Sequence, residues 1–279
     1  MTSALLEKAM SPAILDNAWR RLRNQHTPWS IDVSRDQLEQ HLLGHILECR
    51  ADVLGGNYRP QPLRHFTMRK SDGRQRVLTA QYLRDKLVQR ALLTVLEPRA
   101  EALFHEDSHA YRPHRGVVTA LTRARERIRI GLDWLVDADI ASFFDSIPHR
   151  PLQRQLKRFI DDAAAMRLIE QWLAHGLHQS SFFSRPRGIA QGAILSPLFC
   201  NIYLHQLDKA LAERHIPFVR YADDFLLFAS TKAQAEQAME YVKRMLDKLG
   251  LQLHPRKTQV VRSGPEVNFL GARLPRPSR

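Results

Sequence analysis

Cysteine is scarce in this sequence of 279 residues, and long apolar runs are missing from it. The two cysteines, Cys49 and Cys200, lie far apart and outside any Cys-x-x-Cys spacing, which argues against a disulfide framework and against a zinc site. No apolar run approaches the length that spans a bilayer, and residues 1–10 lack the apolar centre of a signal peptide. We therefore expect a cytoplasmic protein that does not act at a membrane.

Acidic residues are also fewer than basic residues. Lys and Arg total 42 against 29 Asp and Glu, which gives a formal net charge of +13. A surplus of this size, spread along the chain, suits binding to the phosphate backbones of nucleic acids. Charge alone leaves open a basic protein with no nucleic-acid role, or one that binds acidic membrane surfaces. The length favours one compact domain or two closely packed subdomains.

The spacing of apolar residues predicts an α+β protein. Alternation around a Ser-Asp-Gly turn at 71–73 predicts a β-hairpin over residues 63–79. Helical spacing predicts helices over 3–24, 35–54, 83–96 (ended by Pro98), 117–130, 150–178, 197–214 and 232–249. Strand-like runs occupy residues 134–140, 218–229, 251–253, 258–261 and 267–274.

Two of these strand-like runs contain acids among apolar residues. Asp139 ends the first, and the adjacent Asp223 and Asp224 interrupt the second. Neighbouring strand residues point to opposite faces, so an Asp-Asp pair fits best at the tip of a tight hairpin. Buried carboxylates need partners, and two such elements that converge would hold Mg²⁺ ions for an in-line phosphoryl displacement. The alternative is an ordinary Asp-rich turn between two buried strands.

A glycine-rich loop lies between the two acidic runs. Gly188 and Gly192 lie on either side of Gln191, which permits close backbone approach to a ligand. Ser196-Pro197 suits the start of a helix. By itself this loop is well explained as a simple loop-to-helix cap, but the order of acidic strand, Gly-Gln-Gly loop and Asp-Asp hairpin makes that explanation insufficient.

These segments resemble the motifs of reverse transcriptases. Residues 218–228 resemble the Tyr-x-Asp-Asp motif, residues 136–144 resemble the first catalytic motif, and residues 187–197 resemble the Gln-Gly-x-x-x-Ser-Pro motif of the bacterial, group II intron-like branch. Further matches follow in the same order: SHAYRPHR at 108–115, the segment 249–261 with Lys257, and VNFLG at 267–271. The compact form and the segments WLVDADIASFFDSIPH and VRYADDFLLF are similar to reverse transcriptases associated with CRISPR adaptation.

The resemblance implies a right-hand polymerase with fingers, a palm built on an antiparallel sheet, and RNA-directed DNA synthesis. It suggests an N-terminal helical extension over residues 1–57, a fingers-palm domain over 58–274 and a tail over 275–279. Little sequence follows the VNFLG motif, so we expect the thumb to be absent or vestigial. The expected substrates are an RNA template, a DNA or RNA primer and dNTPs. The CRISPR integrase or another protein would then supply the missing grip on the primer and template.

The resemblance also assigns roles to single residues. Asp139, Asp223 and Asp224 would hold two Mg²⁺ ions, for which Mn²⁺ can substitute, with help from the carbonyl of Ile140. Phe144 would be the steric gate that disfavours a 2′-hydroxyl on the incoming nucleotide.

Four basic residues and a glutamine complete the implied site. Gln191 would line the nucleotide pocket, and Arg76, with Arg69 or Lys70, would grip the triphosphate. Lys257 would approach the phosphates and protonate the leaving pyrophosphate; the alternative is a solvated lysine in a turn after Pro255. Among the other acids, Asp137 and Asp145 are interpreted as structural or helix-capping residues.

Two other functions remain open. The chain could be a nucleic-acid-binding subunit whose polymerase site depends on a partner. It could also be a template-independent or protein-primed polymerase that acts in antiphage defence.

Overall fold

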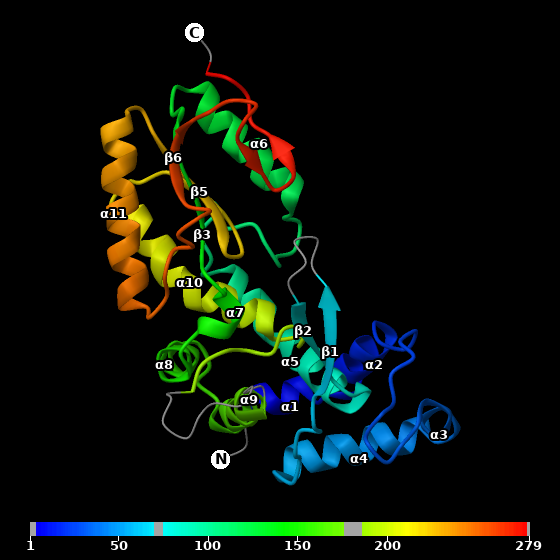
Figure 1. Ribbon diagram of the computed structural model, residues 1–279. Coiled ribbons are helices and arrows are strands. Elements are labelled where there is room, and N and C mark those ends of the chain that lie inside the picture. Colours follow the sequence, from blue (N-terminus) through cyan, green and yellow to red (C-terminus); the bar gives the residue numbers. More distant parts are fainter. Residues whose placement is uncertain (1–3, 70–74, 176–185, 278–279) are drawn as a thin grey trace. The chain divides into compact units, whose positions relative to one another are not determined.

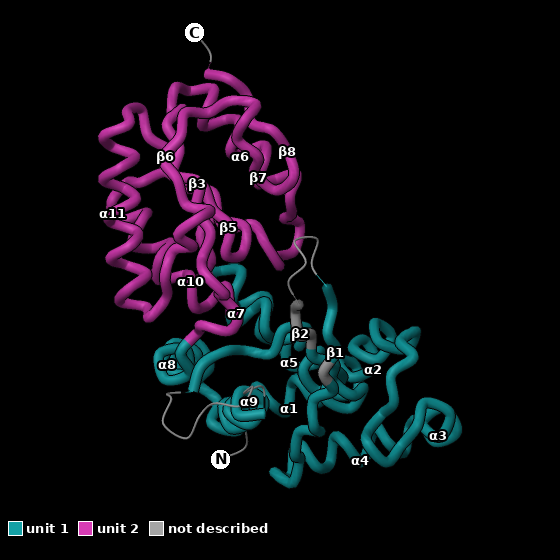
Figure 2. Tube along the Cα trace, viewed as in Figure 1, with its two compact units in different colours: residues 1–102, 148–199 teal, residues 103–147, 200–279 magenta. Residues whose placement is uncertain are grey.

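The computed structural model describes residues 4–69, 75–175 and 186–277 (Figure 1). The chain forms two compact units, and each unit is assembled from two separate stretches of sequence (Figure 2). Unit 1 comprises residues 1–102 and 148–199, and unit 2 comprises residues 103–147 and 200–279. None of the helices that the structure describes is long and apolar enough to cross a membrane.

Unit 1 is mainly helical and contains one two-stranded hairpin. The hairpin strands are antiparallel, paired from Arg64 opposite Ala80 to Arg69 opposite Gln75, and the expected turn at 71–73 lies outside the described residues. The elements are α1 (Ala4–Ala9), α2 (Pro12–Arg20), α3 (Arg35–Gln40), α4 (Leu42–Gly55), β1 (Arg64–Arg69), β2 (Gln75–Ala80), α5 (Leu83–Glu101), α8 (His149–Phe159) and α9 (Ala163–His175).

Two helices that were predicted to be continuous are each broken near the middle. The helix predicted over 3–24 becomes α1 and α2, because Ser11 is extended and Pro12 starts a new helix at its first position. The helix predicted over 35–54 becomes α3 and α4, because His41 leaves the helical region with φ −134° and ψ 35°. Both apolar patterns are correct, but a short break between helices leaves the spacing of apolar residues almost unchanged.

The region predicted as one helix over 150–178 also divides, and here a carboxylate marks the division. Asp162 accepts hydrogen bonds from the amides of Ala164 and Ala165, both at 3.0 Å, at the start of α9. The same carboxylate accepts the amides of Leu5 and Leu6 of α1, both at 3.2 Å. One aspartate therefore caps α9 and ties α1 to it.

Pro98 does not end α5, which continues to Glu101. A proline inside a helix removes one backbone hydrogen bond. Leu96 and Ala100, on either side of it, are buried, and their packing outweighs the loss of that bond in the last turn.

Unit 2 is built on a four-stranded antiparallel sheet in the order β4-β5-β3-β6. The predicted α+β class and antiparallel sheet are thus confirmed, although the strand expected over 251–253 is reduced to a single bridge between Ile140 and Leu253. The elements of this unit are α6 (Val117–Arg129), β3 (Trp134–Asp139), α7 (Phe143–Ser146), β4 (Phe218–Tyr221), β5 (Asp224–Ala229), α11 (Lys232–Lys248), β6 (Gln259–Arg262), β7 (Asn268–Phe269) and β8 (Ala272–Arg273), together with most of α10 (Ser196–Glu213).

Helices pack on this sheet through their apolar stripes. Helix α11 packs on β3, β5 and β6, and helix α6 packs on β4 and β5 (Figure 1). The core beneath α6 combines Ala124 and Ile128 of the helix with Leu135, Leu226 and Phe228 of the strands. Burial of these side chains fixes which face of β3 and β5 points to α6, and this in turn fixes the face on which the acids lie.

A close backbone approach in unit 1 joins the glycine-rich loop to the hairpin. The carbonyl of Gln191 accepts hydrogen bonds from the amide of Thr79 at 3.1 Å and from its hydroxyl at 2.7 Å. Gly192 follows with φ +104°, and a Cβ added there would lie 2.7 Å from the carbonyl oxygen of Thr79. Only a glycine satisfies both the backbone angle and the space at this position.

We predict that Gly192→Ala destabilises the protein by roughly 2–4 kcal/mol, because the left-handed φ and the overlap with Thr79 both cost free energy. Gly56→Ala is the matched control, since Gly56 also has a left-handed φ of +76° but has open space around its added Cβ. That control should cost only about 1–2 kcal/mol. The two free energies of unfolding are compared by urea denaturation, and equal losses would contradict the close approach.

Candidate active site

The register of β3 with β5 brings the predicted acids to one end of the unit 2 sheet. Asp139, the last residue of β3, lies directly opposite Asp224, the first residue of β5. Asp223 lies in the two-residue turn between β4 and β5, after Ala222, as the sequence predicted for a hairpin tip. The amide of Ile140 donates to the carbonyl of Asp223 at 3.2 Å, so the turn is joined to the end of β3.

The acids share one face of the sheet. Alternation along β3 places Asp137 and Asp139 on the same face as Leu135, and the register places Asp224 beside them. The end of β3 is also held by His254, whose amide donates to the carbonyl of Asp139 at 2.7 Å. The apolar core under α6 therefore gives way, along the same face, to a row of carboxylates.

Burial, and after it the neighbouring carboxylates, shifts the protonation of Asp224 and Asp137. Burial, and then the charges of Asp137, Asp139 and Asp223, raise the pKa of Asp224 to about 7. Burial also raises the pKa of Asp137, against a hydrogen bond from Gln259 that lowers it. Burial and the neighbouring carboxylates therefore disfavour the ionised form of Asp224.

Lys257 provides a cation at this end of the sheet. Its ammonium group forms an ion pair with the carboxylate of Asp139, and this hydrogen bond raises the pKa of Lys257. The lysine side chain is 57% exposed, so the ion pair itself adds little stability. Lys257 therefore lies beside one of the predicted metal ligands, and its role toward pyrophosphate stays a prediction.

The donor chemistry at this site fits Mg²⁺. Carboxylate oxygens are the hard donors that Mg²⁺ prefers, together with phosphate oxygens and water, and the carboxylates that raise the pKa of Asp224 are of this kind. Among the side chains that the structure describes, no three His, Cys, Asp or Glu residues are gathered into a ready-made metal cage. An ion that takes only one or two carboxylates and completes its shell with phosphate and water does not require such a cage.

Two residues that follow Asp139 have well-defined positions. Ile140, whose carbonyl was predicted to help bind metal, is buried. Phe144, the predicted steric gate, lies in α7 and is half-buried, and its ring meets that of the buried Phe143 edge to face with centroids 5.8 Å apart. Packing on Phe143 limits how the Phe144 ring can move.

The remaining predicted nucleotide-binding residues belong to unit 1. Gln191 is held through its carbonyl by Thr79 of β2, Arg69 is exposed at the end of β1, and Arg76 lies in β2 opposite Met68. Lys70 lies outside the described residues. The structure thus brings together the acids and Lys257 in unit 2, places Phe144 in α7 of the same unit, and joins Gln191 to the hairpin in unit 1. The roles given to these residues stay predictions.

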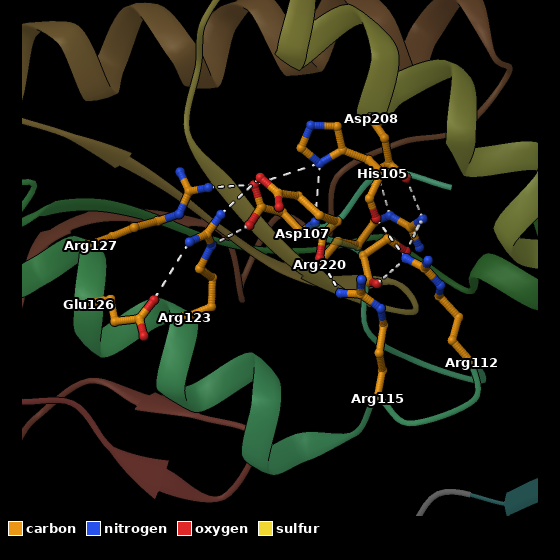
Figure 3. Close-up of polar contacts among 11 residues, drawn as sticks. His105, Asp107, Arg112, Arg115, Arg123, Glu126, Arg127, Asp208 and Arg220 are labelled. Carbon is orange, nitrogen blue, oxygen red and sulfur yellow. Dashed lines mark hydrogen bonds and ion pairs between the residues drawn. The ribbon is translucent and has the colours of Figure 1, made fainter. Parts of the chain in front are cut away.

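A buried polar network beside the acids was not predicted from the sequence. Arg220 of β4 is 1% exposed and forms an ion pair with Asp208 of α10, which is 0% exposed (Figure 3). The signal in the sequence was a single arginine in a strand of otherwise apolar residues, because such a charge needs a buried partner. The identity of that partner, twelve residues earlier in a helix, could not be read from the pattern.

Comparisons with known proteins agree with the motifs. A family model described as reverse transcriptase (RNA-dependent DNA polymerase) matches residues 68–274. Protein YkfC of Escherichia coli K12 is 31% identical over 90% of this chain and 77% of its own length. Group II intron-encoded protein LtrA of Lactococcus lactis subsp. cremoris is 34% identical, but the match covers 68% of this chain and only 31% of LtrA.

Solved structures show the same fold. A chain of a partial Cas6-RT-Cas1–Cas2 complex matches with a TM-score of 0.51 and 23% identity, over 87% of this chain and 42% of that chain. The present chain therefore spans less than half of that protein and about a third of LtrA.

We predict that Asp224→Asn stabilises the metal-free protein by about 1 kcal/mol, because it removes one carboxylate from a crowded, partly buried group. The free energy of unfolding is measured by urea denaturation in the presence of a chelator. Asp133→Asn is the control, since the Asp133 carboxylate has a cationic partner, Arg262, at 2.9 Å and should give no gain. A loss of stability in Asp224→Asn would show that the crowding is compensated.

Proposed function

We propose that this chain, which belongs to the reverse transcriptase family, synthesises DNA on an RNA template by two-metal-ion nucleotidyl transfer. The observation that carries the proposal is the register that sets Asp139 opposite Asp224, with Asp223 in the adjoining turn. Two acids on neighbouring strands and a third at the hairpin tip supply oxygen donors at one end of one sheet.

Each residue of this site has a proposed task. The carboxylates of Asp139, Asp223 and Asp224 hold two Mg²⁺ ions, with the carbonyl of Ile140 as a further donor, and bound Mg²⁺ stabilises the charge that develops on the phosphate. The primer 3′-hydroxyl gives its proton to water, and its oxygen bonds to the α-phosphorus of a dNTP as the bond from that phosphorus to the bridging oxygen of the pyrophosphate breaks. Pyrophosphate leaves, and the ammonium group of Lys257, whose pKa is raised beside Asp139, donates a proton to it.

Asp139→Ala and Asp223→Ala should each lower kcat for primer extension about a thousandfold, because several kcal/mol of charge stabilisation depend on the metal ions. Extension is measured on poly(rA) with oligo(dT) and Mg²⁺, and circular dichroism checks that both variants are folded. Asp145→Asn is the control, since that acid is interpreted as structural and should keep most of the activity. Full activity in either alanine variant would refute the assignment of the metal ligands.

The choice and the grip of the nucleotide are proposed to depend on an aromatic ring, a glutamine and basic side chains. Phe144 blocks the space that a ribose 2′-hydroxyl would occupy, and its packing on Phe143 supports a fixed ring position. Gln191 lines the nucleotide pocket, held in place by the bonds from Thr79. Arg76, with Arg69 or Lys70, grips the triphosphate by paired hydrogen bonds.

Phe144→Ala should weaken discrimination against ribonucleotides by roughly 10–100-fold, because a ring that excludes one hydroxyl is worth a few kcal/mol at most. The ratio of kcat/KM for dTTP to that for UTP is measured on the same primer and template. The kcat/KM for dTTP in the variant serves as the internal control for general damage. An unchanged ratio would remove Phe144 from the role of gate.

We also propose that the chain acts beside a CRISPR integrase in spacer acquisition from RNA, or beside another protein that grips the primer and template. The fold shared with a chain of the Cas6-RT-Cas1–Cas2 complex supports this, although at 23% identity that likeness concerns the fold alone. Extension with and without purified integrase tests partner dependence. Sequencing the product made without primer or template identifies a template-independent activity, which would replace this proposal.

A further inference from the structure

Arg220 is a buried charge in β4 whose five N–H donors are all used. Nε and one Nη2 hydrogen donate to the two carboxylate oxygens of Asp208, at 2.7 and 2.6 Å. The other Nη2 hydrogen donates to the hydroxyl of Ser108 at 2.8 Å. Nη1 donates to the side-chain oxygen of Asn201 and to the carbonyl of Ala222, both at 3.1 Å. No donor of this side chain is left for a nucleic acid.

Helix α10 provides two of these acceptors from one side. Asn201 and Asp208 are seven residues apart, which places them on the same face two turns from each other, and both are 0% exposed. Asn201 is oriented further by its amide, which donates to the carbonyl of Ala110 at 2.8 Å. The guanidinium of Arg220 is thus held in one position by a rigid helix.

The bond to Ala222 holds a strained residue. Ala222 is the first residue of the turn and has a φ of 59°, a left-handed conformation that costs an L-residue roughly 1–2 kcal/mol. The next residue is Asp223, whose carbonyl accepts the amide of Ile140. One hydrogen bond from Arg220 and one from Ile140 therefore fix successive peptide groups of the turn that carries Asp223 and leads into Asp224.

The backbone of β4 is also held on the edge that does not pair with β5. The amide of Arg220 donates to the carbonyl of Asp107 at 2.8 Å, and the amide of His109 donates to the carbonyl of Arg220 at 2.9 Å. The carboxylate of Asp107, 3% exposed, forms ion pairs with Arg123 and Arg127 of α6 (Figure 3). Strand β4 cannot shift along the sheet without breaking this second network.

We propose that Arg220 and Asp208 are positioning residues that keep the Ala222–Asp223 turn in the conformation needed for metal binding and nucleotidyl transfer. This inference rests on the proposed function of the acids. A buried ion pair is on average no more stabilising than well-packed apolar residues of similar volume, so stability alone does not explain it. The geometry of Arg220 explains the pair, because only the planar guanidinium group reaches Asp208 and the Ala222 carbonyl together.

The test replaces the ion pair of Arg220 and Asp208 with apolar side chains of similar volume. Arg220→Met combined with Asp208→Leu should still fold, with some loss in the free energy of unfolding, because the side-chain oxygen of Asn201 and the carbonyl of Ala222 lose their donor. We expect kcat for primer extension to fall about 10–100-fold, because a small misplacement of reacting groups has an effect of that size, while the KM for dNTP changes less than about twofold. Arg262→Met with Asp133→Leu is the control pair, since it removes an ion pair of unit 2 that makes no contact with Ala222.

Two further measurements separate positioning from general damage. Hydrogen exchange of the Ile140 amide, measured by NMR without substrate or metal, should become up to about tenfold faster in the double variant and not in the control pair. Adding Ala222→Gly to the double variant should restore part of kcat, because glycine adopts the left-handed φ without strain.

The outcomes are distinct. A folded double variant with control-like kcat and control-like Ile140 exchange overturns the inference, and so does a loss of kcat that Ala222→Gly leaves unchanged. If the double variant does not fold, Arg220→Lys takes its place, because a lysine keeps the charge beside Asp208 but lacks the second arm that reaches Ala222. Absence of RNA-templated extension by the unaltered chain would refute the proposed function, and the Ile140 exchange would still decide whether Arg220 holds the turn.

Discussion

The pairing of β3 with β5 is the constraint on which the rest of unit 2 depends. A shift of one residue in this register would move Asp139 away from Asp224 and would turn every apolar side chain of β3 to the wrong face. Leu135 opposite Phe228, under α6, prevents that shift. The same packing that stabilises the sheet therefore determines where the carboxylates meet. The register of β3 with β5 therefore determines both the packing of the sheet and the position of the acids, so a change in it would alter both.

Much of this arrangement could be predicted from the sequence, and the physical reasons are clear. Strand alternation and the acids in two apolar runs predicted the hairpin tip and the acidic end of β3, because within each run the signal spans only a few residues. Helix breaks at Ser11 and His41 were missed, since a single non-helical residue hardly disturbs the spacing of apolar residues. The partner of Arg220 was missed for another reason. Ion pairs between a strand and a helix depend on tertiary packing, which no local pattern encodes.

Positive charge has two uses in this protein. Arg69 at the end of β1 is exposed, whereas Arg220 is enclosed and Arg127 is largely covered beside Asp107. The total of 42 lysines and arginines therefore overstates the number of cations free to meet phosphates. The buried arginines connect separate helices and strands, and the planar guanidinium group suits that role better than the ammonium group of lysine does.

Each compact unit is assembled from two stretches of the chain, so the polypeptide passes between the units three times, near residues 102, 147 and 199. A single proteolytic cut at any one of these passages would leave the two units covalently connected through the others. The passages also mean that neither unit can be completed before synthesis has gone well beyond the middle of the chain. Unit 1 waits for the stretch ending at Phe199, and unit 2 waits for nearly the whole chain. Nascent chains of this protein consequently spend a long part of translation with both cores unfinished.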